Sequence, residues 1–183
     1  MASAFSHALV GVAIGQTVRP KKVSWRFWFW GIFCSVIPDV DVIGFHFGIQ
    51  YGDFWGHRGV THSFLFAALL GCVVVLLAFQ DIEEPSQKIR LFFYFFLTAA
   101  SHGVLDAMTN GGMGVAFFSP FNVKRYFFSF RPIEVSPIGV ARFFHNRAIK
   151  VLLSEIKWIW IPVLVWMVVL KSFFRSSKIT SPA

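Results

Sequence analysis

Long apolar runs separated by short polar turns dominate the chain. The clearest run covers 64–79 without a charged residue, and it reaches the length of a membrane span when it is extended back to Gly59. A spanning helix needs about 20 mostly apolar residues, and further runs approach that length over 89–108, 158–170 and 23–37, with a shorter or tilted segment over 3–18. The pattern predicts an all-α, polytopic membrane helical bundle with about four to five membrane-embedded helices.

Helix-breaking and polar residues mark the turns between these runs. Pro38 and Asp39 stop the run over 23–37, and an acidic turn over 80–88 separates the two central spans. The stretch 109–154 is rich in Gly and Pro and predicts a long loop, after which the last helix begins near Glu155 and ends in a basic tail over 171–183. No repeat or linker divides the chain, so we expect one membrane-embedded domain over 1–183.

The composition agrees with a membrane protein. Hydrophobic residues make up 56% of the 183 positions and charged residues 14%, whereas a soluble domain carries about 25% charged residues. The net charge of +8 would indicate nucleic-acid binding in a soluble protein. In a membrane protein, basic residues flank the spans and contact anionic head groups. We therefore expect membrane lipids as partners and no nucleic acid.

Most His and Asp residues gather in four short patches around residue 7 and over 38–41, 56–63 and 101–106. Ionisable residues at membrane depth are costly and indicate function. If five segments alternate across the bilayer, all four patches reach the same membrane face. His102 and Asp106 stand four residues apart and project from one helix face. Asp39 and Asp41 can share a face if the backbone is extended there.

The patches together predict a metal site. Seven side chains supply nitrogen or oxygen ligands: His7, Asp39, Asp41, His57, His62, His102 and Asp106. One closed zinc site needs about four ligands, so seven indicate two ions, or one ion with supporting carboxylates. Imidazole mixed with carboxylate favours Zn, with Mn or Fe as alternatives. Taken singly, these residues have simpler explanations: His7 could be a packed core histidine, and Asp39 could only end a helix. A divalent metal is favoured because all seven side chains are expected at the same membrane face.

Other polar residues lie on the same expected face. Arg58, Lys124 and Arg131 are candidates for binding a phosphate or a lipid head group, with anchoring at the membrane interface as the alternative. Glu134 and Glu155 are weaker candidates for a general base or an extra ligand.

The same patches resemble the YdjM-like family of inner-membrane, metal-dependent hydrolases, some of whose members are described as LexA-regulated. The resemblance is carried by Ser6-His7-Ala8, by Pro38-Asp39-Val40-Asp41, by the sequence GHRGVTHS over 56–63 and by SHGVLDAMT over 101–109. The following NGGMG over 110–114 and Ser119-Pro120-Phe121 also fit the family pattern. The resemblance covers nearly the whole chain and implies a hydrolase in the bacterial inner membrane.

A more distant similarity is to the zinc-dependent bacterial phospholipase C enzymes, which are helical hydrolases that cleave phosphodiesters. The order His, Asp, His and then His-x3-Asp is similar. This chain departs from that pattern because no later His-x3-Glu follows: Ile149 stands four residues after His145. The similarity implies two zinc ions at most and a phosphoester as one class of substrate.

Two functions of different class fit these residues. In a metal-dependent hydrolase, the ion activates a water molecule against a phosphoester or lipid-linked substrate, and Asp41 or Asp39 accepts the proton. In a metal-ion or proton transporter, the same His and Asp residues line a permeation path near the bilayer midplane. The ligands are expected near helix ends, which favours the hydrolase, and a scaffold with a structural metal is a third reading.

Overall fold

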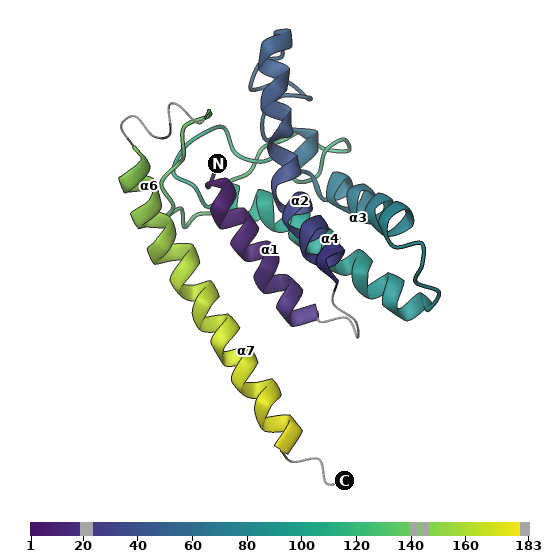
Figure 1. The fold of residues 1–183 in the computed structure, drawn as a ribbon. Coiled ribbons are helices and arrows are strands. Elements are labelled where there is room, and N and C mark those ends of the chain that lie inside the picture. The colour runs from purple at the N-terminus through teal and green to yellow at the C-terminus, as the bar shows by residue number, and fades with distance from the viewer. Residues whose placement is uncertain (19–23, 140–142, 144–146, 180–183) are drawn as a thin grey trace.

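The computed structural model describes residues 1–18, 24–139, 143 and 147–179, and this part of the chain is helical apart from loops and two isolated β-bridges. Two short bundle helices come first, α1 (Ala4–Val18) and α2 (Trp25–Val36), followed by the 3-10 helix η1 (Ile37–Phe47). A 3-10 turn, η2 (Val60–His62), leads into α3 (Phe64–Ala78), and α4 (Pro85–Ala107) follows. After a long loop, α6 (Ala148–Glu155), the π-helical turn η3 (Ile156–Trp160) and α7 (Ile161–Ile179) form one rod (Figure 1).

Helix α4 lies at the centre of the bundle and contacts α1, α2 and α3. Its Tyr94 and Phe95 pack with Phe27 of α2 in the largest buried apolar cluster. A glycine permits the close approach of α2 to α4, because a Cβ atom at Gly31 would lie 1.8 Å from the hydroxyl oxygen of Tyr94. The bundle therefore holds the C-terminal end of α4 at a defined place beside α1 and α2.

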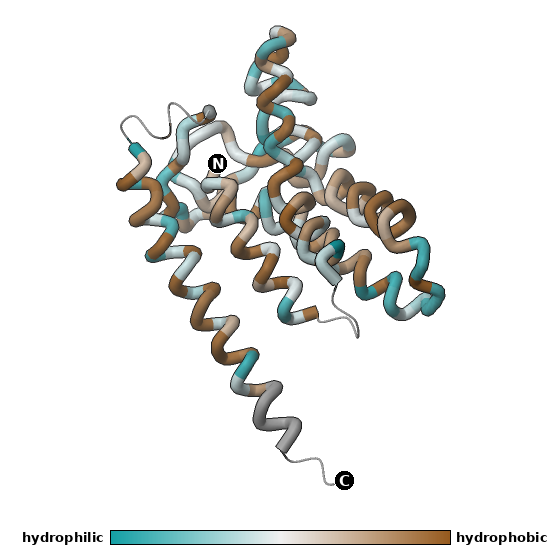
Figure 2. The backbone as a smooth tube through the Cα atoms, viewed as in Figure 1, coloured by the Kyte–Doolittle hydropathy of each residue, from teal (hydrophilic) through white to brown (hydrophobic). Residues whose placement is uncertain are grey.

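The rod made of α6, η3 and α7 packs along α1 and extends past the bundle (Figure 1). Much of its surface is apolar and exposed, as Val165 and Val168 illustrate. The hydropathy colouring shows many apolar residues along α3 and along α7 (Figure 2). Exposed apolar helix faces of this kind suit contact with lipid.

Within the part of the chain that the structure describes, two helical stretches have the length and composition of a membrane span, Trp25–Phe47 and Ala148–Phe173. The other apolar helices do not reach that criterion. Helix α3 has 15 residues, which corresponds to a length of about 22 Å against a hydrocarbon core of about 30 Å. Helix α4 is longer, but it carries Lys88, Arg90 and Asp106. The structure thus supports two candidate spans and several shorter apolar helices, fewer than the four to five expected.

Three local features differ from the expectations. The backbone around Asp39 is a 3-10 helix with Pro38 in its first turn, so the condition under which Asp39 and Asp41 would share a face is not met. The predicted span from Gly59 begins only at Phe64, since the polar residues before it form turns. The loop expected to reach residue 154 ends at Ala148, where α6 begins, and α7 continues helically through the expected basic tail to Ile179.

Candidate metal centre

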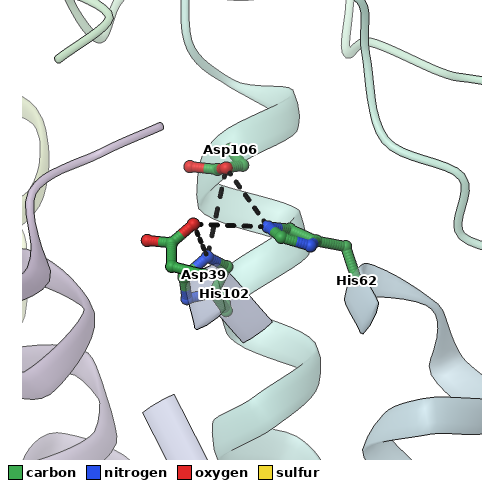
Figure 3. A group of neighbouring side chains, drawn as sticks. All are labelled: Asp39, His62, His102 and Asp106. Carbon is green, nitrogen blue, oxygen red and sulfur yellow. Dashed lines mark ion pairs between the residues drawn. The ribbon is translucent and has the colours of Figure 1, made fainter. Parts of the chain in front are cut away.

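Four side chains from three parts of the chain meet at the ends of the bundle helices (Figure 3). Asp39 comes from η1, just after α2 ends, and His62 comes from η2, just before α3 begins. His102 and Asp106 come from the C-terminal turns of α4, one helical turn apart. His62, His102 and Asp106 are buried, and Asp39 is 9% exposed, so Asp39 is the member of the group nearest to solvent.

The atoms of this group are spaced like the ligands of one ion. Asp39 Oδ1 lies 3.2 Å from His102 Nε2 and 3.6 Å from His62 Nε2. Asp106 Oδ2 lies 3.7 Å from His62 Nε2 and 4.0 Å from His102 Nε2. Ligands at 2.0–2.1 Å from a tetrahedral ion stand about 3.4 Å apart. These four distances bracket that value.

The hydrogen-bond pattern also points to an ion. Both carboxylate oxygens of Asp39 and the Nε2 atoms of His62 and His102 are buried without a hydrogen-bond partner. Leaving a buried polar group unsatisfied costs about 1–3 kcal/mol. A cation shared by Asp39 Oδ1 and the two Nε2 atoms would satisfy three of the four. The residues present therefore fit a divalent metal.

Hydrogen bonds behind His102 set its tautomer. Its Nδ1 lies 2.7 Å from the backbone carbonyl oxygen of Ser35, which can only accept, so Nδ1 carries the proton. The lone pair is then on Nε2, the atom that faces Asp39. This is the usual support of a histidine that binds metal.

Asp41 supports the group from one side. One of its oxygens lies 2.8 Å from His57 Nδ1, and the other accepts hydrogen bonds from the Thr61 hydroxyl at 2.7 Å and the Arg58 backbone N–H at 3.2 Å. The second oxygen is also 3.2 Å from His62 Nδ1. Asp41 therefore orients His62 so that Nε2 faces the other three ligands.

A second group of side chains has ligand atoms close enough together to hold an ion, and it consists of Asp41, His57 and His62. A neutral imidazole has one lone pair, however, and His62 directs Nε2 toward the first group. The short contact between Asp41 and His57 is also a good hydrogen bond. Of the two arrangements expected from the sequence, this geometry favours one ion with supporting carboxylates over two ions.

The electrostatics of the centre favour positive charge. Burial alone would lower the pKa of His62, but the neighbouring carboxylates of Asp106, Asp39 and Asp41 raise it to about 10. For His57, burial lowers the pKa, and Asp41 opposes this only in part. The carboxylates thus surround His62 with enough negative potential to hold a cation.

Arg58 lies behind the centre and is fully buried. Its Nε donates to Asp106 Oδ2 at 3.0 Å, and its two other nitrogens donate to the Gly111 carbonyl at 2.9 Å and the Thr109 hydroxyl at 3.0 Å. Its backbone has φ of 63°, in the left-handed region. This position favours holding Asp106 in place over the contact with substrate that the sequence predicts for Arg58.

His7 stands beside the four ligands on α1 and is fully buried. Its ring stacks on His102 with ring centres 3.7 Å apart, and its Nε2 lies 3.6 Å from Asp106 Oδ1. Neither ring nitrogen has a hydrogen-bond partner. The structure thus brings all seven predicted ligands to one place, with His7, Asp41 and His57 around the group of four.

The remaining candidates lie away from the centre. Lys124 and Arg131 are exposed, and each cation sits over an aromatic ring of the long loop. Glu134 pairs with Lys150 at 3.0 Å on the α6 side. Head-group binding by Lys124 and Arg131 stays a prediction.

Glu155 has a structural place that the sequence does not reveal. It is fully buried, and its carboxylate accepts hydrogen bonds from the Ser3 backbone N–H and hydroxyl and from the Ser6 hydroxyl. The neighbouring Ala2 N–H donates to Asp106 Oδ1 at 2.8 Å. Glu155 thereby fixes the segment that contacts the candidate ligand Asp106, and no sequence motif marks this link.

Apolar helices around a buried His/Asp group at the helix ends define a helical membrane protein with a candidate metal centre. Residues 1–179 match the family model described as YdjM inner membrane protein, and the chain belongs to that family. The chain is also 33% identical over 167 residues to Inner membrane protein YbcI of Escherichia coli (strain K12), a match that covers 91% of this chain and 95% of that protein. No solved structure matches the chain.

These findings confirm the resemblance that the motifs carry. The family and the relative are both named as inner membrane proteins. A bacterial inner-membrane location agrees with those names and with the two candidate spans.

Proposed function

We propose that the protein is a membrane-bound, metal-dependent hydrolase that directs water at a phosphoester or lipid-linked substrate. The observation that carries the proposal is the buried group of Asp39, His62, His102 and Asp106, whose facing atoms have ion-ligand spacing and no other partner. Zn suits these ligands best, with Mn or Fe as alternatives. An ion held there would polarise the substrate and lower the pKa of a water molecule to about 7.

Two carboxylates of the protein have different roles in the proposed reaction, one as proton acceptor and one as a positioning group. Asp39 Oδ1 faces the two histidines, while its Oδ2 has no hydrogen-bond partner, and Asp39 lies nearest to solvent. Asp39 is therefore the better proton acceptor of the two candidates. Asp41 is engaged by His57, Thr61 and the Arg58 backbone, which suits positioning.

The place of the ligands favours hydrolysis over transport. Asp106 is the residue before the last one of α4, and His62 precedes the first residue of α3 by two positions. A transport site is expected near the bilayer midplane, at a break within spanning helices. His62, His102 and Asp106 lie at helix ends, which suits an enzyme with access from one membrane face, whereas Asp39 lies within the candidate span Trp25–Phe47.

Metal analysis of the purified protein tests the centre. The wild type is expected to hold about one divalent ion per chain, and His102→Ala is expected to lose it. His46→Ala is the matched control, because His46 is exposed and lies outside the group. Equal metal content in the wild type and in His102→Ala would overturn the site.

Activity is tested with phosphomonoester, phosphodiester and phospholipid substrates, each with chelator and with metal added back. Turnover that chelator abolishes and metal restores, and that His102→Ala lacks, supports the proposal. Turnover indifferent to chelator overturns it. Metal-loaded protein that is inert on every substrate but moves ions across liposomes would establish the transporter instead.

A further inference from the structure

A small pocket lined by both polar and apolar residues lies behind the loop that carries His57 and His62. The pocket has a volume of about 140 Å³, and Gly59, Ser119, Asp53 and Arg125 contribute to its lining. Arg125 donates to the backbone carbonyls of His57 at 2.8 Å, Tyr51 at 3.0 Å and Asp53 at 3.1 Å. Backbone groups of the loop thus face Arg125, while the side chains of His57 and His62 face the metal centre.

The charge of Arg125 is not neutralised by an ion pair. Among the residues that the structure describes, no carboxylate forms an ion pair with its guanidinium, which donates to carbonyls and lies 5.8 Å from the centre of the Tyr51 ring. Asp53 also lines the pocket, and its carboxylate accepts the Gln50 backbone N–H at 2.8 Å. An anionic group entering the pocket could pair with the Arg125 guanidinium, against the like charge of the Asp53 carboxylate in the same lining.

Ser119 provides a second sign of a missing ligand. Its side chain is 1% exposed, yet its hydroxyl has no hydrogen-bond partner. Buried hydroxyls are normally satisfied. Ser119 belongs to the lining of the same pocket as Arg125, and its hydroxyl is a candidate donor to a phosphate oxygen placed there.

A second pocket, which is apolar, shares one lining residue with the first. It has a volume of about 380 Å³, and Ser119 belongs to both linings. Its other lining residues are apolar: Phe64, Leu65, Phe117, Phe118 and Phe121. Phe121 is 87% exposed, so the apolar pocket opens at the protein surface, beside the start of α3. A cationic pocket joined to an aromatic groove matches a molecule with an anionic head and an apolar chain.

We propose that this composite pocket binds one membrane phospholipid, with its phosphate between Arg125 and Ser119 and an acyl chain along Phe64, Phe118 and Phe121. The pocket is separate from the metal centre, because the loop backbone around Gly59 lies between them. Lipid binding at this pocket therefore does not depend on whether the protein is a hydrolase. Its phosphate contacts the outer side of the loop that carries two of the metal-site histidines.

Lipid titration of delipidated protein in detergent, read by native mass spectrometry, tests the site. The probes are phosphatidylglycerol and phosphatidylethanolamine with chains of ordinary length, and inorganic phosphate serves as a competitor. Ser119→Ala is expected to weaken the first bound lipid by about tenfold, since it removes one hydrogen bond to a charged group. Phe121→Ala is expected to weaken it several-fold. Neither change should harm the fold, because the hydroxyl bonds nothing within the protein and Phe121 is exposed.

Two matched controls complete the experiment. Ser129→Ala removes an exposed hydroxyl, and Phe47→Ala removes an exposed aromatic ring near the same end of the bundle. Both are expected to bind lipid like the wild type. Equal lipid binding in all variants would overturn the proposal and indicate a nonspecific lipid belt. Competition by inorganic phosphate with no effect of Phe121→Ala would also overturn it, in favour of a free-anion site. Since no turnover is measured, the result is independent of the hydrolase proposal.

Discussion

The pair of Asp106 and Arg58 allows folding and metal binding to be separated. Both side chains are fully buried, and Arg58 Nε donates to Asp106 Oδ2 at 3.0 Å. Asp106→Asn preserves the shape of the side chain but leaves the Arg58 charge without a carboxylate. Removing one partner of a buried ion pair costs about 3–5 kcal/mol. For a chain of this length that cost lowers the unfolding temperature by roughly 6–20 °C.

The double variant Arg58→Met, Asp106→Asn removes the unpaired charge. Met has a similar length and needs no carboxylate partner, so the double variant is expected to regain most of the lost unfolding temperature. It should not regain the metal, because the carboxylate ligand is still missing. Thermal unfolding in detergent, followed by circular dichroism, gives the stability, and elemental analysis of the same samples gives the metal content.

Two results would refute this reasoning. An Asp106→Asn variant that unfolds within about 2 °C of the wild type would show that the buried pair does not carry the expected energy. A double variant that holds as much metal as the wild type would remove Asp106 from the ligands. Arg58→Met alone, which leaves Asp106 present, is the control for loss of the guanidinium contacts.

Three further predictions address the support of the site and the bundle. Asp41→Asn should weaken metal affinity about 10–100-fold without abolishing it, as expected for a residue that orients ligands, and a metal titration measures this. Gly31→Ala should destabilise the bundle by about 1–3 kcal/mol, because its Cβ would overlap a tyrosine hydroxyl of α4. Gly52→Ala, whose Cβ has its nearest neighbour at 3.6 Å, should leave thermal unfolding nearly unchanged. Glu155→Gln should destabilise by about 1–3 kcal/mol, since it leaves buried donors poorly paired, whereas Glu134→Gln near the surface should cost under about 1 kcal/mol.

The sequence predicts much of the site because its spacing is local. His102 and Asp106 stand one helical turn apart, so any α-helix through them presents both on one face. The alternation of helices brings the other patches to the same end, and the structure confirms that Asp39 and His62 lie within ligand distance of that pair. Residue type and helical period are sufficient for these predictions.

The different roles of the individual residues in the cluster could not be predicted from residue type and spacing. Asp39 and Asp41 are chemically identical and two positions apart, yet one faces the histidine Nε2 atoms and the other is held by three donors. The turn of the 3-10 helix separates them, whereas an extended backbone would have put them on one face. Arg58 likewise has the composition of a phosphate binder but points inward from a left-handed backbone.

The sequence by itself determined that the chain is an apolar helical protein, that it belongs with the YdjM inner membrane proteins, and that its few His and Asp residues gather at one end. The apolar helices and the grouping of His and Asp follow from residue type and helical period, which are local, whereas the family follows from the resemblance of the motifs. Tertiary structure alone decided that the Ser35 carbonyl directs His102, that Glu155 holds the segment beside Asp106, and that Ser119 is buried without a partner. Those contacts join residues far apart in the chain, often through backbone atoms that every residue possesses, and no sequence pattern marks them.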